Sequence, residues 1–415
     1  MNTFTNPDWF PAKGKSCLLK YGQVSLYLWE NVASNCHRNL SSTIPDDYDF
    51  NNTEISQLHR LKMQKGSWPS DGRGCEHCRD QEAIGGVSDR MQWLKNDSNK
   101  RYMPKELLQN PKTLKVQPTQ VSVHFNNKCN AKCVYCGPNL SSAWVLEKRL
   151  AGEDVSKFDT YEKNYKQRVE KFWKWMDNNY QNLKAFDILG GEPFIQQETW
   201  DCVDKMIAMP NPDCDVEIYS NMQVKPKLFA RGMDKLRILA KTVRRIDFVA
   251  SIDCWGPASD YIRFGTDTKT FETNMTYLVE ECPEIIPTMN WTVSSLSIPY
   301  TSDLIKRVIE WNKTRYVSVN YNKCIDPQIY DPHIFPEGTF TDYIEEIKKL
   351  NNTMYQGGNK GYLEFVDTMF EEVDKSPAKP ELMRRLRERL TELDERRGTD
   401  WRETFPWLTY VGHNL

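Results

Sequence analysis

Three cysteines lie close together in one short stretch of the chain: Cys129, Cys133 and Cys136, separated by three and two residues. They directly follow residues 121–125, an apolar run typical of a buried strand. Three thiolates on one loop can bind a single metal centre. A 4Fe–4S cluster held by three cysteines would keep one iron free to bind a small molecule, whereas zinc would take a fourth ligand. The spacing alone leaves both metals open.

The cysteine loop opens a region in which strand and helix patterns alternate. Six runs rich in β-branched and aromatic residues lie at 121–125, 185–189, 215–219, 245–251, 290–295 and 316–320. Helical periodicity occupies residues 161–179, 197–209, 225–241, 269–281 and 301–311. This alternation predicts βα units around a parallel sheet, with more than one helix in the long first crossover. Parallel barrels carry their sites at the C-terminal ends of the strands, where the cysteine loop begins.

The cysteine loop, with Tyr135 just before its last cysteine, resembles the signature of the radical S-adenosylmethionine (SAM) superfamily. Residues 190–193, Gly-Gly-Glu-Pro, follow the second predicted strand and are similar to that family's glycine-rich motif. Ser251 and Asp253, at the end of the fourth strand, are similar to its S-x-D motif. The resemblance continues in order along all six strands. It implies an α/β fold, an incomplete (βα)6 barrel.

The resemblance also implies an activity. The cysteine triad would bind a 4Fe–4S cluster, whose remaining iron chelates the amino and carboxylate groups of SAM. One electron then cleaves a carbon–sulfur bond of SAM, and the resulting 5′-deoxyadenosyl radical removes a hydrogen from the substrate. Residues implied to contact SAM are Tyr135, Gly190, Gly191, Glu192, Pro193, Ser220, Asn221, Ser251, Asp253, Arg263 and Ser294.

Physical chemistry gives several of these contacts a reason. Glycine carbonyls can approach an ammonium group closely, and Glu192 supplies the opposite charge. Tyr135 would flank the adenine or simply pack in the loop. Arg263 would meet the SAM carboxylate or form a surface ion pair. Met222 stands where related enzymes often have glycine, which affects the turn after the third strand.

A second group of cysteines precedes the barrel: Cys17, Cys36, Cys75 and Cys78. A hairpin built on residues 24–29 would bring Cys36 near Cys17, and Cys75 and Cys78 would complete a four-thiolate site. The group resembles the auxiliary-cluster region of twitch- and SPASM-type members, here placed before the barrel. A second Fe–S cluster, structural zinc and free thiols all remain open, and His37 or His77 can substitute for a cysteine ligand.

The patterns divide the chain into three parts. Residues 1–115 form an irregular cysteine-rich module, 116–337 the partial barrel, and 338–415 a charged helical region. In the last part, one helix face carries Leu382, Leu386, Leu390 and Leu393. This face predicts a helix docked on the barrel, or alternatively one that binds a partner or RNA.

Composition limits the possible partners. The chain has 415 residues and a formal net charge of −2, so bulk charge does not hold it to nucleic acid or a membrane. It shows neither an apolar run long enough to span a bilayer nor a signal peptide, which predicts a cytoplasmic protein. Without export, clustered cysteines indicate metal or redox chemistry rather than disulfides. The other cysteines are expected to be small buried residues: Cys202, Cys214, Cys254, Cys282 and Cys324.

The leading hypothesis is therefore a radical SAM enzyme that acts on a peptide or protein, with an electron donor such as flavodoxin or ferredoxin. Nucleotides and small metabolites are alternative substrates. A rival from another class is a zinc-binding interaction protein without radical chemistry. The glycine-rich and S-x-D motifs count against this rival, because a zinc scaffold does not need an amino-acid-binding loop at the mouth of a barrel.

Overall fold

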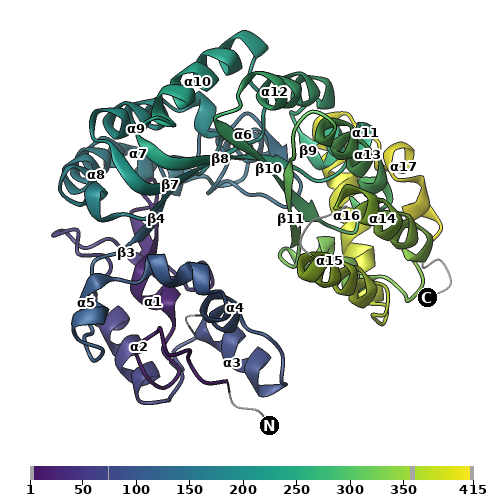
Figure 1. Cartoon of the computed structure of the whole chain (residues 1–415). Coiled ribbons are helices and arrows are strands. Elements are labelled where there is room, and N and C mark those ends of the chain that lie inside the picture. The colour runs from purple at the N-terminus through teal and green to yellow at the C-terminus, as the bar shows by residue number, and fades with distance from the viewer. Residues whose placement is uncertain (1–3, 73, 356–359, 412–415) are drawn as a thin grey trace.

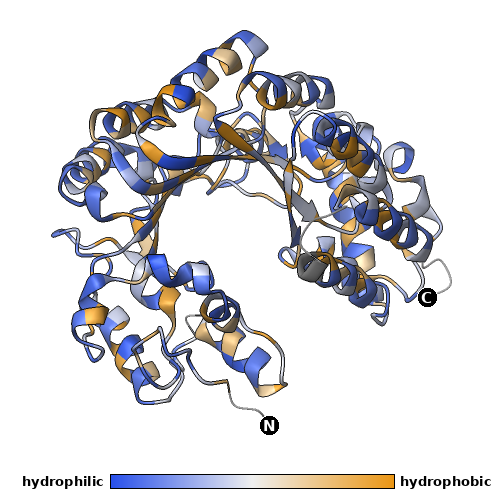
Figure 2. Cartoon of the chain, viewed as in Figure 1, coloured by the Kyte–Doolittle hydropathy of each residue, from blue (hydrophilic) through white to orange (hydrophobic). Residues whose placement is uncertain are grey.

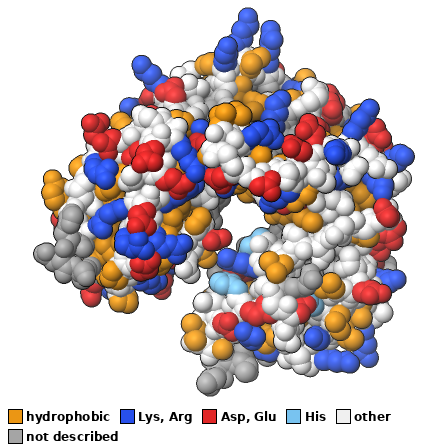
Figure 3. Space-filling view, turned by 180° about the vertical axis from the view of Figure 1, so that it is seen from behind, with side chains coloured by type: hydrophobic (Ala, Val, Ile, Leu, Met, Phe, Trp, Pro, Cys, Tyr) orange, Lys and Arg blue, Asp and Glu red, His pale blue; other side chains and the backbone are white. Residues whose placement is uncertain are grey.

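A computed structural model describes residues 4–72, 74–355 and 360–411 of the chain. Its elements follow one another around an open ring, and the N-terminal and C-terminal parts face each other across the opening (Figure 1). The space-filling view shows that the ring surrounds a hollow at its middle (Figure 3). The molecule is thus a barrel that does not close.

One nine-stranded sheet runs through the ring, in the order β11-β10-β8-β7-β6-β4-β1-β2-β3. Six of these strands are parallel neighbours in chain order: β4 Gln120–His124, β6 Ala185–Leu189, β7 Asn211–Ser220, β8 Val243–Ile252, β10 Ile285–Val293 and β11 Ser318–Lys323. They correspond to the six predicted runs, so the predicted incomplete (βα)6 barrel is confirmed.

The helices between these strands cover the outer face of the sheet (Figure 1). They are α6 Ser142–Leu150, α7 Ser156–Lys163, α8 Tyr165–Asn179, α9 Gln197–Ala208, α10 Pro226–Leu239, α11 Pro257–Ile262, α12 Thr268–Glu281 and α13 Thr301–Asn312. The first crossover holds three of them, and the single helix predicted over 161–179 is two helices that meet at Asn164. The other predicted helices are confirmed to within two residues.

The two faces of the sheet differ in polarity. On the outer face, neighbouring strands align apolar side chains in one row, which the helices bury: Val121, Phe186, Val216, Ile246 and Ile285. Figure 2 shows how hydrophobic the central strands are. One residue along, the inner face carries a polar row of Ser122, Asp187, Glu217 and Asp247. Because strand side chains alternate, the same strands supply both an apolar core and a polar hollow.

The N-terminal part is more ordered than the sequence predicts. It contains α1 Leu18–Gly22, α2 Glu54–Gln64, α3 Cys75–Ala83, α4 Asp89–Lys95 and α5 Lys105–Gln109, together with β1 Gln23–Tyr27, β2 Val32–Ser34 and β3 Ser42–Thr43. The helices have 5 to 11 residues, too few to show a clear apolar period. Strand β1 pairs in parallel with β4, so the boundary predicted at residue 116 runs between two paired strands.

The C-terminal part contains α14 Thr341–Met354, α15 Lys360–Val373, α16 Pro380–Arg397 and α17 Trp401–Thr404. Helix α16 buries Leu386, Leu390 and Leu393 completely, and Leu382 is half-buried. The predicted docking of this helix on the barrel is confirmed. In the part of the chain that the structure describes, no helix has the length and apolar character that crossing a membrane requires.

A buried arginine joins the N-terminal helices to the segment that enters β4. The guanidinium of Arg60 on α2 is fully buried. It donates to the carbonyl oxygens of Lys20 (2.8 Å), Asn51 (2.8 Å) and Leu114 (2.7 Å) and to the side chains of Asn51 and Asn52. Since these acceptors come from three separate segments, Arg60 connects them in place of an apolar core.

We expect Arg60→Met to lower the free energy of unfolding by about 3 kcal/mol or more, because it leaves several buried carbonyl groups without a donor. Urea unfolding at neutral pH measures the change. The matched control is Arg79→Met, since Arg79 pairs only with its exposed neighbour Asp80; this variant should stay within about 0.5 kcal/mol of wild type. Equal stability of the two variants would contradict the role of Arg60.

Candidate functional site

A cavity of about 220 Å³ opens at the C-terminal ends of β4, β6, β7 and β8. It brings together most of the residues that the sequence singles out: Cys129, Cys133, Tyr135, Cys136, Gly190, Gly191, Pro193, Ser220, Asn221, Ser251 and Arg263. Glu192, Asp253 and Ser294 are not in its lining. Parallel strands end at one edge, so motifs far apart in the sequence meet there.

The cysteine loop leaves β4 and forms one strand of a small second sheet. In this sheet β5 Lys132–Cys133 pairs with β9 Arg263–Phe264, which places Cys133 opposite Arg263. The amide of Ala131 donates to Sγ of Cys129 (3.4 Å), and the amide of Cys129 donates to Oγ of Ser142 (3.2 Å). These bonds and the small sheet hold the loop at the edge of the cavity.

The three thiols of the loop suit a metal centre by their chemistry. Burial raises the pKa of Cys129 to about 11 and also raises that of Cys133 and Cys136. Among the described residues, no three cysteine, histidine or acidic side chains are grouped so that they could hold one metal ion. The thiols are instead spread along the wall of the cavity. Soft thiolates around a space larger than one ion fit an Fe–S cluster, with one iron left for a further ligand.

The glycine turn after β6 packs directly against the cysteine loop. Gly190 and Gly191 have φ of +88° and +53°. A Cβ on Gly190 would lie 2.8 Å from Cβ of His124, and one on Gly191 would lie 2.3 Å from the carbonyl oxygen of Lys128. The two glycines are therefore required for the close approach of two backbones.

Glu192 is fully buried behind this turn and connects it to the end of β7. Its Oε1 accepts hydrogen bonds from Oγ of Ser220 (2.8 Å) and the amide of Phe194 (3.1 Å). Its Oε2 accepts one from the amide of Asn221 (2.6 Å). These donors are all neutral, and burial raises the pKa of Glu192 to about 7. The carboxylate holds two motif loops together without a cation bonded to it.

Met222 follows this pair in the position where related enzymes often have glycine. Its φ is +63°, a conformation that side chains rarely adopt, and its side chain is fully buried. Oγ of Ser220 accepts a hydrogen bond from the Met222 amide (2.9 Å). The turn keeps a glycine-like backbone despite the substitution.

Asp253 and Arg263 form a buried ion pair beside the cysteine loop. Nη2 of Arg263 donates to Oδ1 of Asp253 (2.8 Å), and the hydroxyl of Tyr135 donates to Oδ2 (2.7 Å). Nη1 of Arg263 lies 4.0 Å from Sγ of Cys133. Arg263 is thus not a surface ion pair, and Tyr135 is attached to Asp253 through its hydroxyl group. Burial opposes the charge of Arg263, but Asp253 keeps its pKa well above the usual value.

The sequence reasoning missed His124, the last residue of β4, which lines the cavity. Its ring stacks on that of Tyr27 in β1, with centroids 4.2 Å apart. Burial lowers the pKa of His124 to about 4, and its Nδ1 is buried without a partner among the described residues. A neutral imidazole therefore faces the site. The period-two pattern of β4, which places His124 on the inner face with Ser122, is the signal that identifies it.

Ser294 lies apart from this cavity. It is fully buried, and its hydroxyl and amide are both bonded within a tight turn to Ser297. The sequence position at the end of a barrel strand suggested a SAM contact. The local turn explains why the residue is polar without one.

The four N-terminal cysteines line one small enclosed cavity, with Arg38, Asp89 and Arg90 beside them. The predicted hairpin exists as β1 and β2, and it brings Cys36 to Cys17. The amide of Arg38 donates to Sγ of Cys36 (3.5 Å). Burial raises the pKa of all four thiols. Neither His37 nor His77 is in the lining, and His37 pairs with Asp89 (3.0 Å).

Comparison with known proteins gives only loose likenesses. No family model matches the chain, and no curated protein does. Streptococcus suis SuiB bound to its precursor peptide SuiA aligns at 15% identity and a TM-score of 0.34, over 78% of this chain and 59% of that one. SuiB bound to S-adenosylmethionine gives 17% and 0.37, over 67% and 56%.

A structure of TYW1 with a lysine–pyruvate adduct gives 13% identity and a TM-score of 0.29, over 54% of this chain and 69% of that one. The present chain spans less than two thirds of the length of the SuiB chains. Overlaps this loose do not assign a function, which must come from the residues of the site.

We expect the metal-free protein to lose stability as the pH rises through the range set by Glu192. Its folded pKa of about 7 lies above the ordinary value near 4.5, so the folded state binds the proton more tightly. The contribution is fully present below about pH 4.5 and is lost as the pH rises to about 7, a change of about 3 kcal/mol. Urea unfolding of wild type and Glu192→Gln at pH 5 and pH 8 measures it. The same pH dependence in both proteins would show that Glu192 does not titrate in this way.

Proposed function

We propose that the protein is a radical SAM enzyme, which binds a 4Fe–4S cluster and SAM and removes a hydrogen atom from a substrate. One observation carries the proposal: the thiols of the cysteine triad, the glycine turn and the polar ends of β7 and β8 line a single cavity. Three thiols and a polar wall match the two ends of the ligand pair, a cluster and an amino acid joined to a nucleoside.

In this proposal Cys129, Cys133 and Cys136 would hold the cluster. When bound, it would supply the electron that cleaves SAM to methionine and a 5′-deoxyadenosyl radical. Carbonyl groups of the glycine turn, with Glu192 behind them, would bind the ammonium group. Arg263, held by Asp253, would be the cation nearest to the carboxylate.

The remaining SAM contacts follow from the polarity of the wall. Ser220, Asn221 and Ser251 offer hydroxyl and amide groups to the ribose, and Tyr135 offers a ring to the adenine. His124 is neutral, so it can accept or donate a hydrogen bond without adding charge. The predicted contact by Ser294 is not part of this proposal, because its polar atoms are already bonded.

For the substrate we propose a peptide or protein, following the resemblance to twitch- and SPASM-type members, with flavodoxin or ferredoxin as the electron donor. A nucleotide or small metabolite is the alternative. Screening cellular extracts for a mass shift that depends on SAM and reductant would distinguish these classes. A non-catalytic zinc protein is the rival, and it would produce no 5′-deoxyadenosine.

We expect the variant with Cys129, Cys133 and Cys136 all changed to Ala to lose about one cluster's worth of iron after anaerobic reconstitution. It should make no 5′-deoxyadenosine from SAM and dithionite. Iron assay and chromatography measure the two outcomes. Cys282→Ala, which removes a buried thiol outside both cysteine groups, is the control and should keep both properties. SAM cleavage by the triple variant would rule out the assignment.

We further propose that the N-terminal cysteines bind a second, separate metal centre, either an Fe–S cluster or zinc. Support comes from the convergence of four thiols from three segments on one enclosed cavity. The triple Ala variant should therefore retain metal in stoichiometric amount, and adding Cys75→Ala and Cys78→Ala should remove it. Metal analysis by mass spectrometry gives the counts. A folded triple variant that carries no metal would exclude the second centre.

A further inference from the structure

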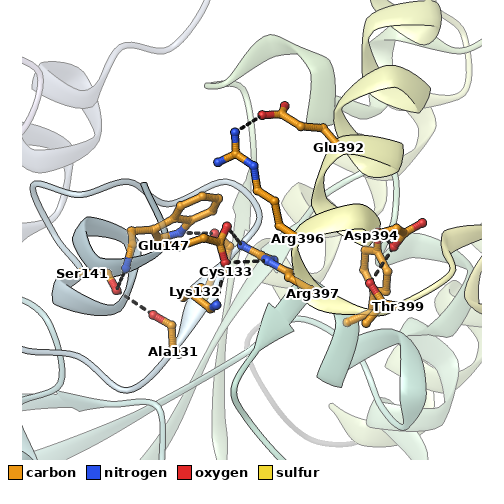
Figure 4. Close-up of polar contacts among 12 residues, drawn as sticks. Ala131, Lys132, Cys133, Ser141, Glu147, Glu392, Asp394, Arg396, Arg397 and Thr399 are labelled. Atoms are coloured by element: carbon orange, nitrogen blue, oxygen red, sulfur yellow. Dashed lines mark hydrogen bonds and ion pairs between the residues drawn. The ribbon is translucent and has the colours of Figure 1, made fainter. Parts of the chain in front are cut away.

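The last residue of α16 reaches back to the cysteine loop, more than 250 residues earlier in the chain. Arg397 ends the helix, and its side chain is only 2% exposed. Figure 4 shows it pointing from the end of α16 toward Lys132, Cys133 and Glu147. A buried cation at a helix C-terminus is favourably placed for the helix dipole, but this one is directed away from the helix.

Arg397 forms a buried, two-pronged ion pair with Glu147 on α6. Its Nε and Nη2 donate to Oε2 (3.1 Å) and Oε1 (3.2 Å) of that carboxylate. Oε2 also pairs with Nζ of Lys132 (2.6 Å), the residue before Cys133. Although burial opposes ionisation of Glu147, hydrogen bonds from Arg397 and Lys132 hold its pKa below the usual value. The carboxylate thus links the end of α16 to the cysteine loop.

The guanidinium also lies between two aromatic rings that belong to the loop's surroundings. It is 4.7 Å from the ring centre of Trp144 and 4.9 Å from that of Phe264. Nε1 of Trp144 donates to the carbonyl oxygen of Cys133 (3.0 Å), and Phe264 pairs with Lys132 in the small sheet. All three contacts of Arg397 therefore lead to Lys132 or Cys133.

We propose that Arg397 is a positioning residue for the cysteine triad: it fixes the backbone of β5 so that the Cys133 thiolate and Arg263 face the cavity in the orientation that cluster and SAM require. This role rests on the proposed function. Its mechanical part, the restraint of β5 by the C-terminal helix, exists without any metal. Arginine is needed because a planar group can stack on two rings and bind a carboxylate with two hydrogen bonds.

The test compares Arg397→Met with Arg396→Met in the full-length protein. Arg396 is the matched control, because it sits on the same turn and pairs with Glu153 and Glu392 but contacts neither ring. In the metal-free proteins, iodoacetamide labelling followed by mass spectrometry reports the access of each thiol. We expect Cys133 to react several times faster in Arg397→Met than in Arg396→Met or wild type. Equal rates in the three proteins would overturn the proposal.

The second measurement uses the reconstituted proteins. Loss of a residue that orients metal ligands typically weakens metal binding about 10- to 100-fold, so we expect weaker iron retention and a changed EPR signal of the reduced cluster with SAM. A purely stabilising role would lower the melting temperature and leave the labelling rate and the EPR signal of the loaded fraction unchanged, which would also overturn the proposal.

Two further arms keep the outcome decisive. If Arg397→Met does not fold, Trp144→Phe replaces it, because phenylalanine keeps a ring and removes only the donor to the Cys133 carbonyl. Faster labelling of Cys133 is again the expected result. If wild type itself binds no iron through the triad, the proposed function fails, and the labelling arm still decides whether α16 restrains β5.

Discussion

The cysteine loop and the glycine turn meet backbone to backbone, and the rest of the site depends on that contact. The amide of Glu192 donates to the carbonyl oxygen of Lys128 (2.8 Å), one residue before Cys129. A Cβ on Gly191 would clash with the same oxygen. Because no side chain fits between the two loops, the distance from the thiols to every group after β6 is set by the peptide backbone. Backbone contacts of this kind tolerate little displacement.

Burial at this contact leaves two carboxylates in different electrostatic states. Asp253 has a cation and a phenol bonded to it, so its charge is compensated within the protein. Glu192 has only neutral donors, and its pKa is raised to about 7. A buried carboxylate without a cation is costly and favours any ligand that brings positive charge. This asymmetry supports the ammonium end of SAM beside Glu192 in the proposed function.

Both ends of the chain contribute to the position of the same loop. From the N-terminal part, Tyr27 stacks on His124, and Oε2 of Glu30 accepts from Nδ2 of Asn139 (2.7 Å), just after the last cysteine of the triad. From the C-terminal part, Arg397 reaches Glu147 and the rings beside Cys133. An open barrel lacks the closing strands that would brace such a loop. Here the flanking parts of the chain brace it instead.

The sequence by itself determined the order of the six barrel strands, the cysteine triad after the first of them, and the motifs after the second and fourth. These features are local, since strand and helix periods and motif spacing are written in neighbouring residues. The fold made Glu192 a link between two turns, attached Tyr135 to Asp253 and placed His124 and Arg397 at the site. Those roles depend on contacts between residues as far apart as Glu147 and Arg397, separated by 250 positions. No local pattern encodes such a pairing, so only the tertiary structure could decide it.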